Sequence, residues 1–215
     1  LQSILSEMNI KIEVIGAENL PDNGRCFFVA NHPFGFVDGL VLTNIVSSKY
    51  GEFKAIGNEV FMLIPQLRPL IAAVNVFGTN RRDYLVELDR IFKSDIPITH
   101  FPAGLVSRLH NFKVRDSQWQ KSFITKTFEC ERSIVPFYFY GRNSLLFYSV
   151  YLIRRTIGIK ATLELALLPH EFFNKRNKTI KVKIGKPISY SDFDKNQKHN
   201  DIAQWVKSKV YEMRK

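Results

Sequence analysis

The stretch CFFVANHPFGFVDG, residues 26–39, decides how the rest of the chain is interpreted. Its first five residues, Cys26–Ala30, are apolar without interruption, which is typical of a strand buried on both faces of a sheet. A turn containing Gly35 follows, and apolar residues at helical spacing come after Asp38. In open α/β sheets, functional sites gather where strands end in loops, so this junction is a candidate site.

His32 and Asp38 form the candidate catalytic pair. A neutral imidazole can take a proton from a hydroxyl when its other ring nitrogen is held as a donor, and Asp38 lies within reach for that purpose. The alternative is structural: the histidine is satisfied within the turn and the aspartate caps the next helix. The two roles can coexist, so the residues alone leave both open.

The segment FPAGLVSR, residues 101–108, repeats the layout of strand, glycine turn and polar or charged side chain. Backbone N–H groups around Ala103 and Gly104 are candidate donors to an oxyanion, because glycine permits close approach of a substrate. Ser107 is not expected to be a nucleophile, since no G-x-S-x-G elbow surrounds it. His100 and His110 flank the turn without a carboxylate spaced to orient either, so we expect them to be core or surface histidines.

Three arginines are candidates for holding an anionic group of a substrate. Arg81 and Arg82 follow a predicted strand, and Arg108 follows the Gly104 turn. A guanidinium can hold a carboxylate or phosphate in a bidentate manner. The alternative for each is a solvated cation without a ligand.

Strand and helix signals alternate along the chain, without repeats or low-complexity linkers. This alternation predicts a single α/β domain over residues 1–215, with a mixed β-sheet flanked by helices. Strands are predicted at 10–15, 25–30, 53–56, 74–77, 96–101, 134–140, 162–168 and 180–184. Helices are predicted after Gly39, around 85–92 with Asp83 as N-cap, and at 119–130, 145–155 and 201–213.

The charge of the chain is unevenly distributed. The net charge is +11 over 215 residues, but residues 1–107 carry −2 and residues 108–215 carry +13. A basic half favours an anionic partner, such as an acidic carrier protein, a phospholipid surface or a thioester cofactor with phosphates. Nucleic acid is not predicted as a partner, because no zinc-finger spacing or RNA-recognition motif is present.

Composition narrows the class further. Cys26 and Cys130 lack metal-ligand spacing, so we expect reduced structural thiols and no metal site. No apolar run is long enough to span a bilayer. The most apolar segment, residues 61–78, is expected either to lie on a membrane or to form a buried helix pair. The sequence begins at Leu1 rather than Met, which leaves open whether a natural N-terminal segment precedes it.

Taken together, these motifs resemble the four blocks of the glycerophosphate/lysophospholipid acyltransferase superfamily, which has the PlsC-like fold. Asn31-His32 through Asp38 resembles the first block, Asn80-Arg81-Arg82 the second, Phe101-Pro102-Ala103-Gly104 the third and Ile134-Val135-Pro136 the fourth. The chain departs from the pattern in having Ala103 where the third block has a glutamate, and five residues between His32 and Asp38 instead of four. Its variant motifs are similar to the haemolysin-like branch, whose enzymes O-acylate N-acyl amino acids to make ornithine- or glycine-type lipids.

The resemblance implies an O-acyltransferase that moves a fatty acyl group from a thioester to the hydroxyl of a lyso-lipid. It implies His32 as general base, Asp38 as its orienting carboxylate, and the arginines as ligands of the acceptor. No permanently bound cofactor is expected; the donor would be acyl carrier protein, with acyl-CoA as the alternative. The expected location is the cytoplasmic face of the membrane, in peripheral contact with anionic lipid, or the cytoplasm. A 1-acylglycerol-3-phosphate acyltransferase and a non-catalytic lipid-binding module of the same fold remain alternatives.

Overall fold

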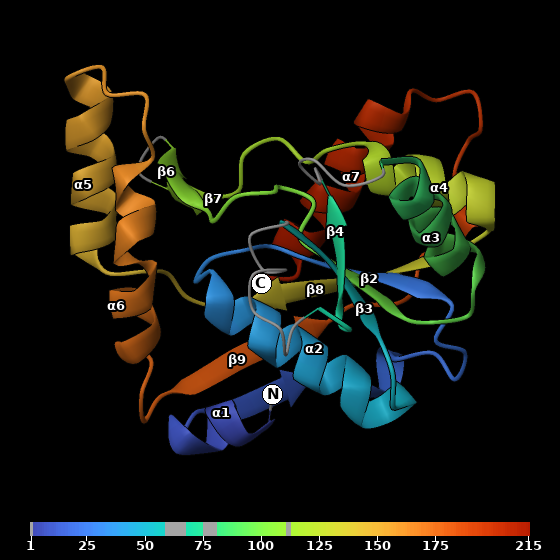
Figure 1. Ribbon diagram of the computed structural model, residues 1–215, viewed down its shortest axis with the longest axis horizontal. Coiled ribbons are helices and arrows are strands. Elements are labelled where there is room, and N and C mark those ends of the chain that lie inside the picture. Colours follow the sequence, from blue (N-terminus) through green and yellow to red (C-terminus); the bar gives the residue numbers. More distant parts are fainter. Residues whose placement is uncertain (1, 59–67, 75–80, 111–112) are drawn as a thin grey trace.

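A seven-stranded mixed β-sheet forms the centre of the protein (Figure 1). The computed structural model describes residues 2–58, 68–74, 81–110 and 113–215. The strands, in spatial order, are β1 (Lys11–Ile15), β9 (Thr179–Ile184), β8 (Ser133–Phe139), β2 (Cys26–Ala30), β5 (Ile98–His100), β3 (Lys54–Asn58) and β4 (Ile71–Val74). Neighbouring strands are parallel except β8 and β9, which run antiparallel. A separate two-stranded antiparallel sheet pairs β6 (Arg108–His110) with β7 (Lys113–Arg115).

Helices cover both faces of the central sheet (Figure 1). One face packs against α2 (Phe36–Tyr50), and the other against α3 (Arg81–Lys93), α4 (Ser122–Cys130) and α7 (His199–Glu212). The other helical elements among the described residues are α1 (Gln2–Glu7), α5 (Leu145–Thr156), α6 (Leu168–Phe173) and the 3-10 turns η1 (Ala17–Asn19), η4 (Leu163–Leu167) and η5 (Tyr190–Asp192). The predicted fold class, an α/β domain with a mixed sheet between helices, is confirmed.

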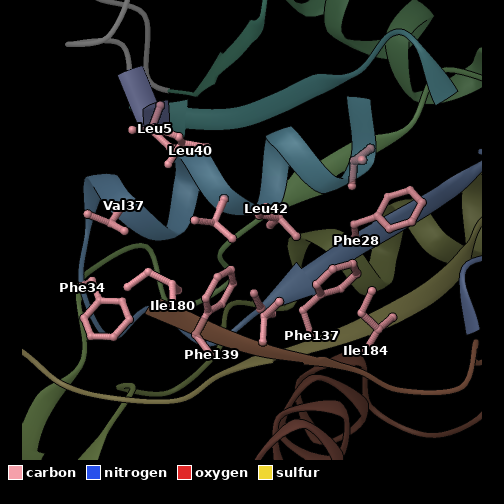
Figure 2. Close-up of a cluster of buried hydrophobic side chains, with 14 of the residues drawn as sticks. Leu5, Phe28, Phe34, Val37, Leu40, Leu42, Phe137, Phe139, Ile180 and Ile184 are labelled. Carbon is pink, nitrogen blue, oxygen red and sulfur yellow. The ribbon is translucent and has the colours of Figure 1, made fainter. Parts of the chain in front are cut away.

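Strand β2 lies in the middle of the sheet, as its uninterrupted apolar sequence predicts. All five of its residues are buried, and their side chains alternate between the two cores. Phe28 packs with the α2 core, whereas Phe27 and Val29 face the core of α4 and α7. Figure 2 shows the first of these cores, where Phe28 lies with Phe137 and other apolar side chains beside α2. Burial on both faces holds the end of β2, and hence the turn that follows, in a fixed position.

One predicted strand is wrong. Residues 162–168 alternate apolar and other side chains, but they form the turn η4 and lead into α6, which carries Pro169 in its first turn. The burial is the reverse of what a strand would give, since Leu163 is half exposed and Glu164 is fully buried. Ion pairs of Glu164 with two arginines determine this local structure, and no local apolar pattern reveals them.

Two smaller predictions also need correction, and one segment is described only in part. Asp83 is not the N-cap of its helix, because α3 already begins at Arg81. Helix α4 begins at Ser122, three residues after the predicted start.

Of the apolar segment 61–78, residues 71–74 form strand β4 rather than a helix, and most of the rest lies outside the described residues. The predicted strand 74–77 overlaps the described part only at Val74.

Candidate active site

The structure brings His32 and Asp38 into contact at the carboxyl end of β2. The imidazole Nδ1 lies 3.0 Å from Oδ2 of Asp38, within hydrogen-bond distance. Asp38 occupies the first turn of α2, where its carboxylate also accepts the backbone N–H groups of Phe34 at 2.8 Å and Gly35 at 3.0 Å. The aspartate therefore caps the helix and contacts the histidine at the same time, as the two roles can coexist; the catalytic role itself stays a prediction.

The turn between the two residues needs its glycine. Gly35 has a φ of +95°, in the left-handed region that side chains with a Cβ rarely adopt. A Cβ at this position would also lie 3.0 Å from a methyl carbon of Leu168. This conformation directs the Gly35 N–H at Asp38, and so the glycine contributes to holding the carboxylate in place.

Burial and hydrogen bonding act against each other on Asp38. The side chain is fully buried, and burial raises the pKa of its carboxyl above the ordinary value of 3.8. The contact with His32 and the two backbone N–H groups oppose this rise in pKa because they favour the charged form. Oδ2 accepts two backbone N–H groups and also lies within hydrogen-bond distance of His32 Nδ1, so its geometry is that of a hydrogen-bond acceptor.

His32 is oriented but remains accessible. Its ring stacks on Phe101, with the ring centroids 4.1 Å apart, and the side chain is 18% exposed to solvent. Because Nδ1 contacts Asp38, Nε2 is the nitrogen left to act on a substrate. Phe101 follows strand β5, which pairs with β2, so the sheet itself brings the first and third motifs together.

Asn31 fastens the start of the motif to the neighbouring strand. Its side-chain amide donates to the carbonyl of Phe139 at 3.0 Å and its side-chain oxygen accepts from the Phe139 N–H at 2.7 Å. This pair of bonds continues the contact between β2 and β8 one residue beyond the end of β2. It explains in physical terms why an asparagine precedes the histidine.

The loop after Phe101 contains the predicted oxyanion donors. The Gly104 N–H donates to the carbonyl of Phe101 at 3.0 Å, so this particular group is not free to receive a substrate oxygen in this conformation. Ala103 is buried beside it, and the Ser107 N–H donates to the carbonyl of His32 at 2.8 Å. The loop thus lies against the His32 turn, while its role as an oxyanion site stays a prediction.

Asp116 belongs to the site, although the sequence does not reveal it. This buried carboxylate accepts the backbone N–H of His32 at 3.2 Å and the indole N–H of Trp119 at 2.9 Å. It also accepts the hydroxyl of Ser107. Asp116 therefore ties the His32 turn, the loop after β5 and the segment before α4 together. Only the three-residue spacing to Trp119 is visible in the sequence, and by itself that spacing indicates nothing.

Arg108 is placed in a buried ion pair. Its Nε lies 3.1 Å from Oε1 of Glu164, and its guanidinium lies over the rings of Phe147 and Tyr151. Glu164 is shared with Arg154. Burial lowers the pKa of the Arg108 guanidinium, and the charge of Glu164 opposes that effect. Binding of an acceptor by Arg108 remains a prediction, with Glu164 as the carboxylate that an acceptor would have to displace.

The other candidates are placed as follows. Arg81 and Arg82 are the first two residues of α3, and their side chains lie outside the described part of the chain.

His100 is buried, and burial lowers its pKa to about 3, so it is a neutral core histidine at physiological pH. His110 is exposed, as expected for a surface histidine. Cys26 and Cys130 are buried free thiols, and burial raises the pKa of Cys26 to about 11.

Two other features are absent from the described residues: a cluster of metal ligands and a membrane-spanning helix. In the described ranges, no group of three or more histidine, cysteine or acidic side chains is arranged to hold a metal ion. None of the helices that the structure describes is long and apolar enough to cross a membrane.

Comparison with known proteins assigns the class. A family model described as acyltransferase matches residues 3–215, and the chain belongs to this acyltransferase family. The resemblance to the PlsC-like superfamily is thereby confirmed. A solved structure, the 1-acyl-sn-glycerophosphate acyltransferase PlsC from Thermotoga maritima, shares the fold with a TM-score of 0.60, covering 99% of this chain and 75% of that one at 16% identity.

Two curated relatives are more similar in sequence. Both are named lyso-glycine lipid O-acyltransferase. The protein from Phocaeicola vulgatus is 39% identical over 214 residues, which cover 99% of this chain and 77% of the relative. The protein from Bacteroides thetaiotaomicron is 37% identical over the same length, covering 99% and 79%. The resemblance of the motifs to the haemolysin-like branch, which contains ornithine- and glycine-lipid O-acyltransferases, is confirmed by these relatives.

Proposed function

We propose that this protein transfers a fatty acyl group from an acyl thioester to the hydroxyl of a lyso-glycine lipid. The observation that carries the proposal is the contact of His32 Nδ1 with the buried Asp38 carboxylate at 3.0 Å, on an accessible imidazole. The names of the two relatives support the choice of acceptor.

In the proposed mechanism, His32 Nε2 removes the proton of the acceptor hydroxyl as its oxygen attacks the thioester carbonyl carbon. Asp38 holds the tautomer with the proton on Nδ1 and stabilises the imidazolium that forms. When the tetrahedral intermediate collapses, the carbon–sulfur bond breaks and the imidazolium returns its proton to the leaving sulfur. The products are an ester and a free thiol, and no covalent enzyme intermediate is formed.

The acceptor of this reaction carries a carboxylate rather than a phosphate. Ala103 stands where the resembled third block has a glutamate, so the loop next to His32 presents no acidic side chain of that block to repel a carboxylate. Arg81 and Arg82 are the first candidates to bind that carboxylate, because Arg108 already has Glu164 as its partner. A lysophosphatidate acceptor is the alternative that the experiment distinguishes.

We propose acyl carrier protein as the donor. Residues 108–215 carry a net charge of +13, which is complementary to an acidic carrier. Increasing salt should then raise the KM for acyl carrier protein strongly, because screening weakens the attraction of exposed charges. A KM that is independent of salt, with efficient turnover of acyl-CoA, would favour the cofactor donor instead.

The experiment measures thiol release from each donor, with lyso-glycine lipid and lysophosphatidate offered separately. His32→Ala should lose about 10²–10⁴-fold in turnover, the usual contribution of general-base catalysis. His110→Ala, at an exposed histidine outside the site, is the matched control and should retain activity. Release with lysophosphatidate alone would contradict the acceptor, and unchanged turnover of His32→Ala would contradict the mechanism.

A further inference from the structure

Helix α5 presents an apolar face to the outside of the protein. Leu146, Ile153 and Ile157 are 51%, 61% and 64% exposed, and their spacing places them along one side of the helical segment. Leu145, at the start of the helix, is also largely exposed. We call these four side chains, Leu145, Leu146, Ile153 and Ile157, the outer α5 surface. Clustered exposure of large aliphatic side chains marks an interaction site, in contrast to single ones.

The opposite side of α5 is also apolar, and it is packed. Phe147, Tyr148 and Tyr151 are buried there, with Arg108 over two of the rings. Ser144 caps the helix and its backbone N–H donates to Glu171 of α6 at 2.9 Å. The inner face therefore packs the helix against the protein, and the aliphatic side chains of the outer face stay exposed.

The segment that carries this surface is basic. Residues 141–180, all of which the structure describes, contain seven lysines and arginines and two acidic residues. Both acidic residues, Glu164 and Glu171, are buried, so every charged side chain that this segment exposes is cationic. The exposed cations include Arg142, Arg155, Lys160, Arg176 and Lys178. An apolar helical face bordered by lysine and arginine is typical of a helix that lies in the interface of an anionic membrane.

The same unit adjoins the catalytic turn. The ring of Phe172 in α6 lies 5.5 Å from that of Phe36, the first residue of α2. Lys175 lies 4.5 Å over the ring of Phe34, and its ammonium donates to the carbonyl of Arg142. Figure 1 shows α5 and α6 together at one end of the protein, opposite α3 and α4. A membrane at this end would therefore lie on the side of the molecule that carries the His32 turn.

We infer that the outer α5 surface rests on an anionic lipid bilayer. The inference builds on the proposed function, because an acceptor and a product with long acyl chains partition into membranes. A second copy of the chain is a poorer occupant, since two such basic surfaces repel one another. An acyl carrier protein would pair its acidic residues with the cations, but it would leave the large aliphatic side chains without an apolar partner. Bilayer headgroups and hydrocarbon satisfy both parts of the surface.

The test measures binding of the full chain to vesicles of phosphatidylcholine, with and without phosphatidylglycerol. The double variant Leu146→Ser/Ile153→Ser should bind the anionic vesicles at least about tenfold more weakly than wild type, because two large apolar side chains no longer enter the interface. Val86→Ser is the matched control, since Val86 is 64% exposed but lies on α3 at the other end. It should bind as wild type does.

Thiol release with a short-chain, water-soluble hydroxyl acceptor checks that the double variant is folded, and it should be unchanged. His32→Ala should bind vesicles normally, so a failure of the proposed chemistry leaves this readout intact. Equal binding by the double variant and wild type would overturn the inference. So would carrier-protein binding that depends on Leu146 and Ile153 without any vesicle binding.

Discussion

The backbone N–H of His32 donates to the carboxylate of Asp116 at 3.2 Å, across 84 positions of the chain. The same carboxylate accepts from Ser107, next to the loop that lies against His32, and from Trp119 at the approach to α4. The position of the proposed general base therefore depends on a residue outside the recognisable motifs. Asp116 acts through His32 and is a positioning residue.

Asp116→Asn should lower turnover by about 10–100-fold, the loss that removing the outer partner of a metal-bound histidine commonly causes, because here too the partner fixes the position of the histidine. Both oxygens of Asp116 accept hydrogen bonds, and an amide replaces one acceptor by a donor. If Asp116 only positions the base, kcat falls while the KM for the thioester and the acid limb of the pH profile stay near wild type. Asp192→Asn, at an exposed capping carboxylate, is the control. Full activity in Asp116→Asn would contradict the assignment.

Gly141→Ala should disturb the active site from a distance. Gly141 has a φ of +128°, and an added Cβ would lie 2.4 Å from the ring of Phe34, whose N–H donates to Asp38. We expect a loss of about 1–3 kcal/mol in the free energy of unfolding, with reduced turnover. Gly39→Ala is the matched control, because its Cβ meets nothing within 4 Å in helix α2 and should stabilise by about 0.5–1 kcal/mol. Urea unfolding of both variants measures the difference, and equal stabilities would refute the clash.

Glu164→Gln should cost about 3 kcal/mol or more of unfolding free energy. Glu164 is fully buried between Arg108 and Arg154, and removing its charge leaves the buried Arg108 guanidinium uncompensated. Glu212→Gln removes the partner of Lys209 in an exposed pair and should cost less than about 1 kcal/mol. Similar losses for the two variants in urea unfolding would show that the buried cluster is not a principal source of stability.

Asp38 should stabilise the protein less as the pH rises. Burial raises the pKa of the Asp38 carboxyl in the folded state above the ordinary value of 3.8. This carboxyl therefore ionises at a lower pH in the unfolded chain than in the native protein. Unfolding then releases a proton between the two pKa values, and the stability contributed by Asp38 is complete below the ordinary value and declines through that interval. Urea unfolding of wild type and Asp38→Asn at pH 4, close to the ordinary value, and at pH 8 should show a larger advantage of wild type at pH 4. An advantage that grows with pH would mean that the folded-state pKa is lowered instead.

The fold could be predicted well where hydrophobic periodicity determines structure. Uninterrupted apolar residues place β2 and β8 in the centre of the sheet, and one-sided apolar spacing places α7 on its surface. The prediction failed at 162–168, because an alternating pattern over so short a segment does not distinguish a strand from a 3-10 turn. There, a buried ion pair between residues 56 positions apart determines the structure.

The sequence by itself determined the catalytic pair as a candidate, because His32 and Asp38 are joined by one short turn whose glycine and helix start are visible locally. It also determined the family, since the four motifs follow one another in the family's order, although Ala103 replaces the glutamate of the third. Only the tertiary structure decided that Asp116 supports His32, that Arg108 is occupied by Glu164, and that α5 turns its aliphatic side chains outward. These relationships join residues far apart in the chain, or depend on which side of a helix is covered, and neither leaves a periodic signal in the sequence.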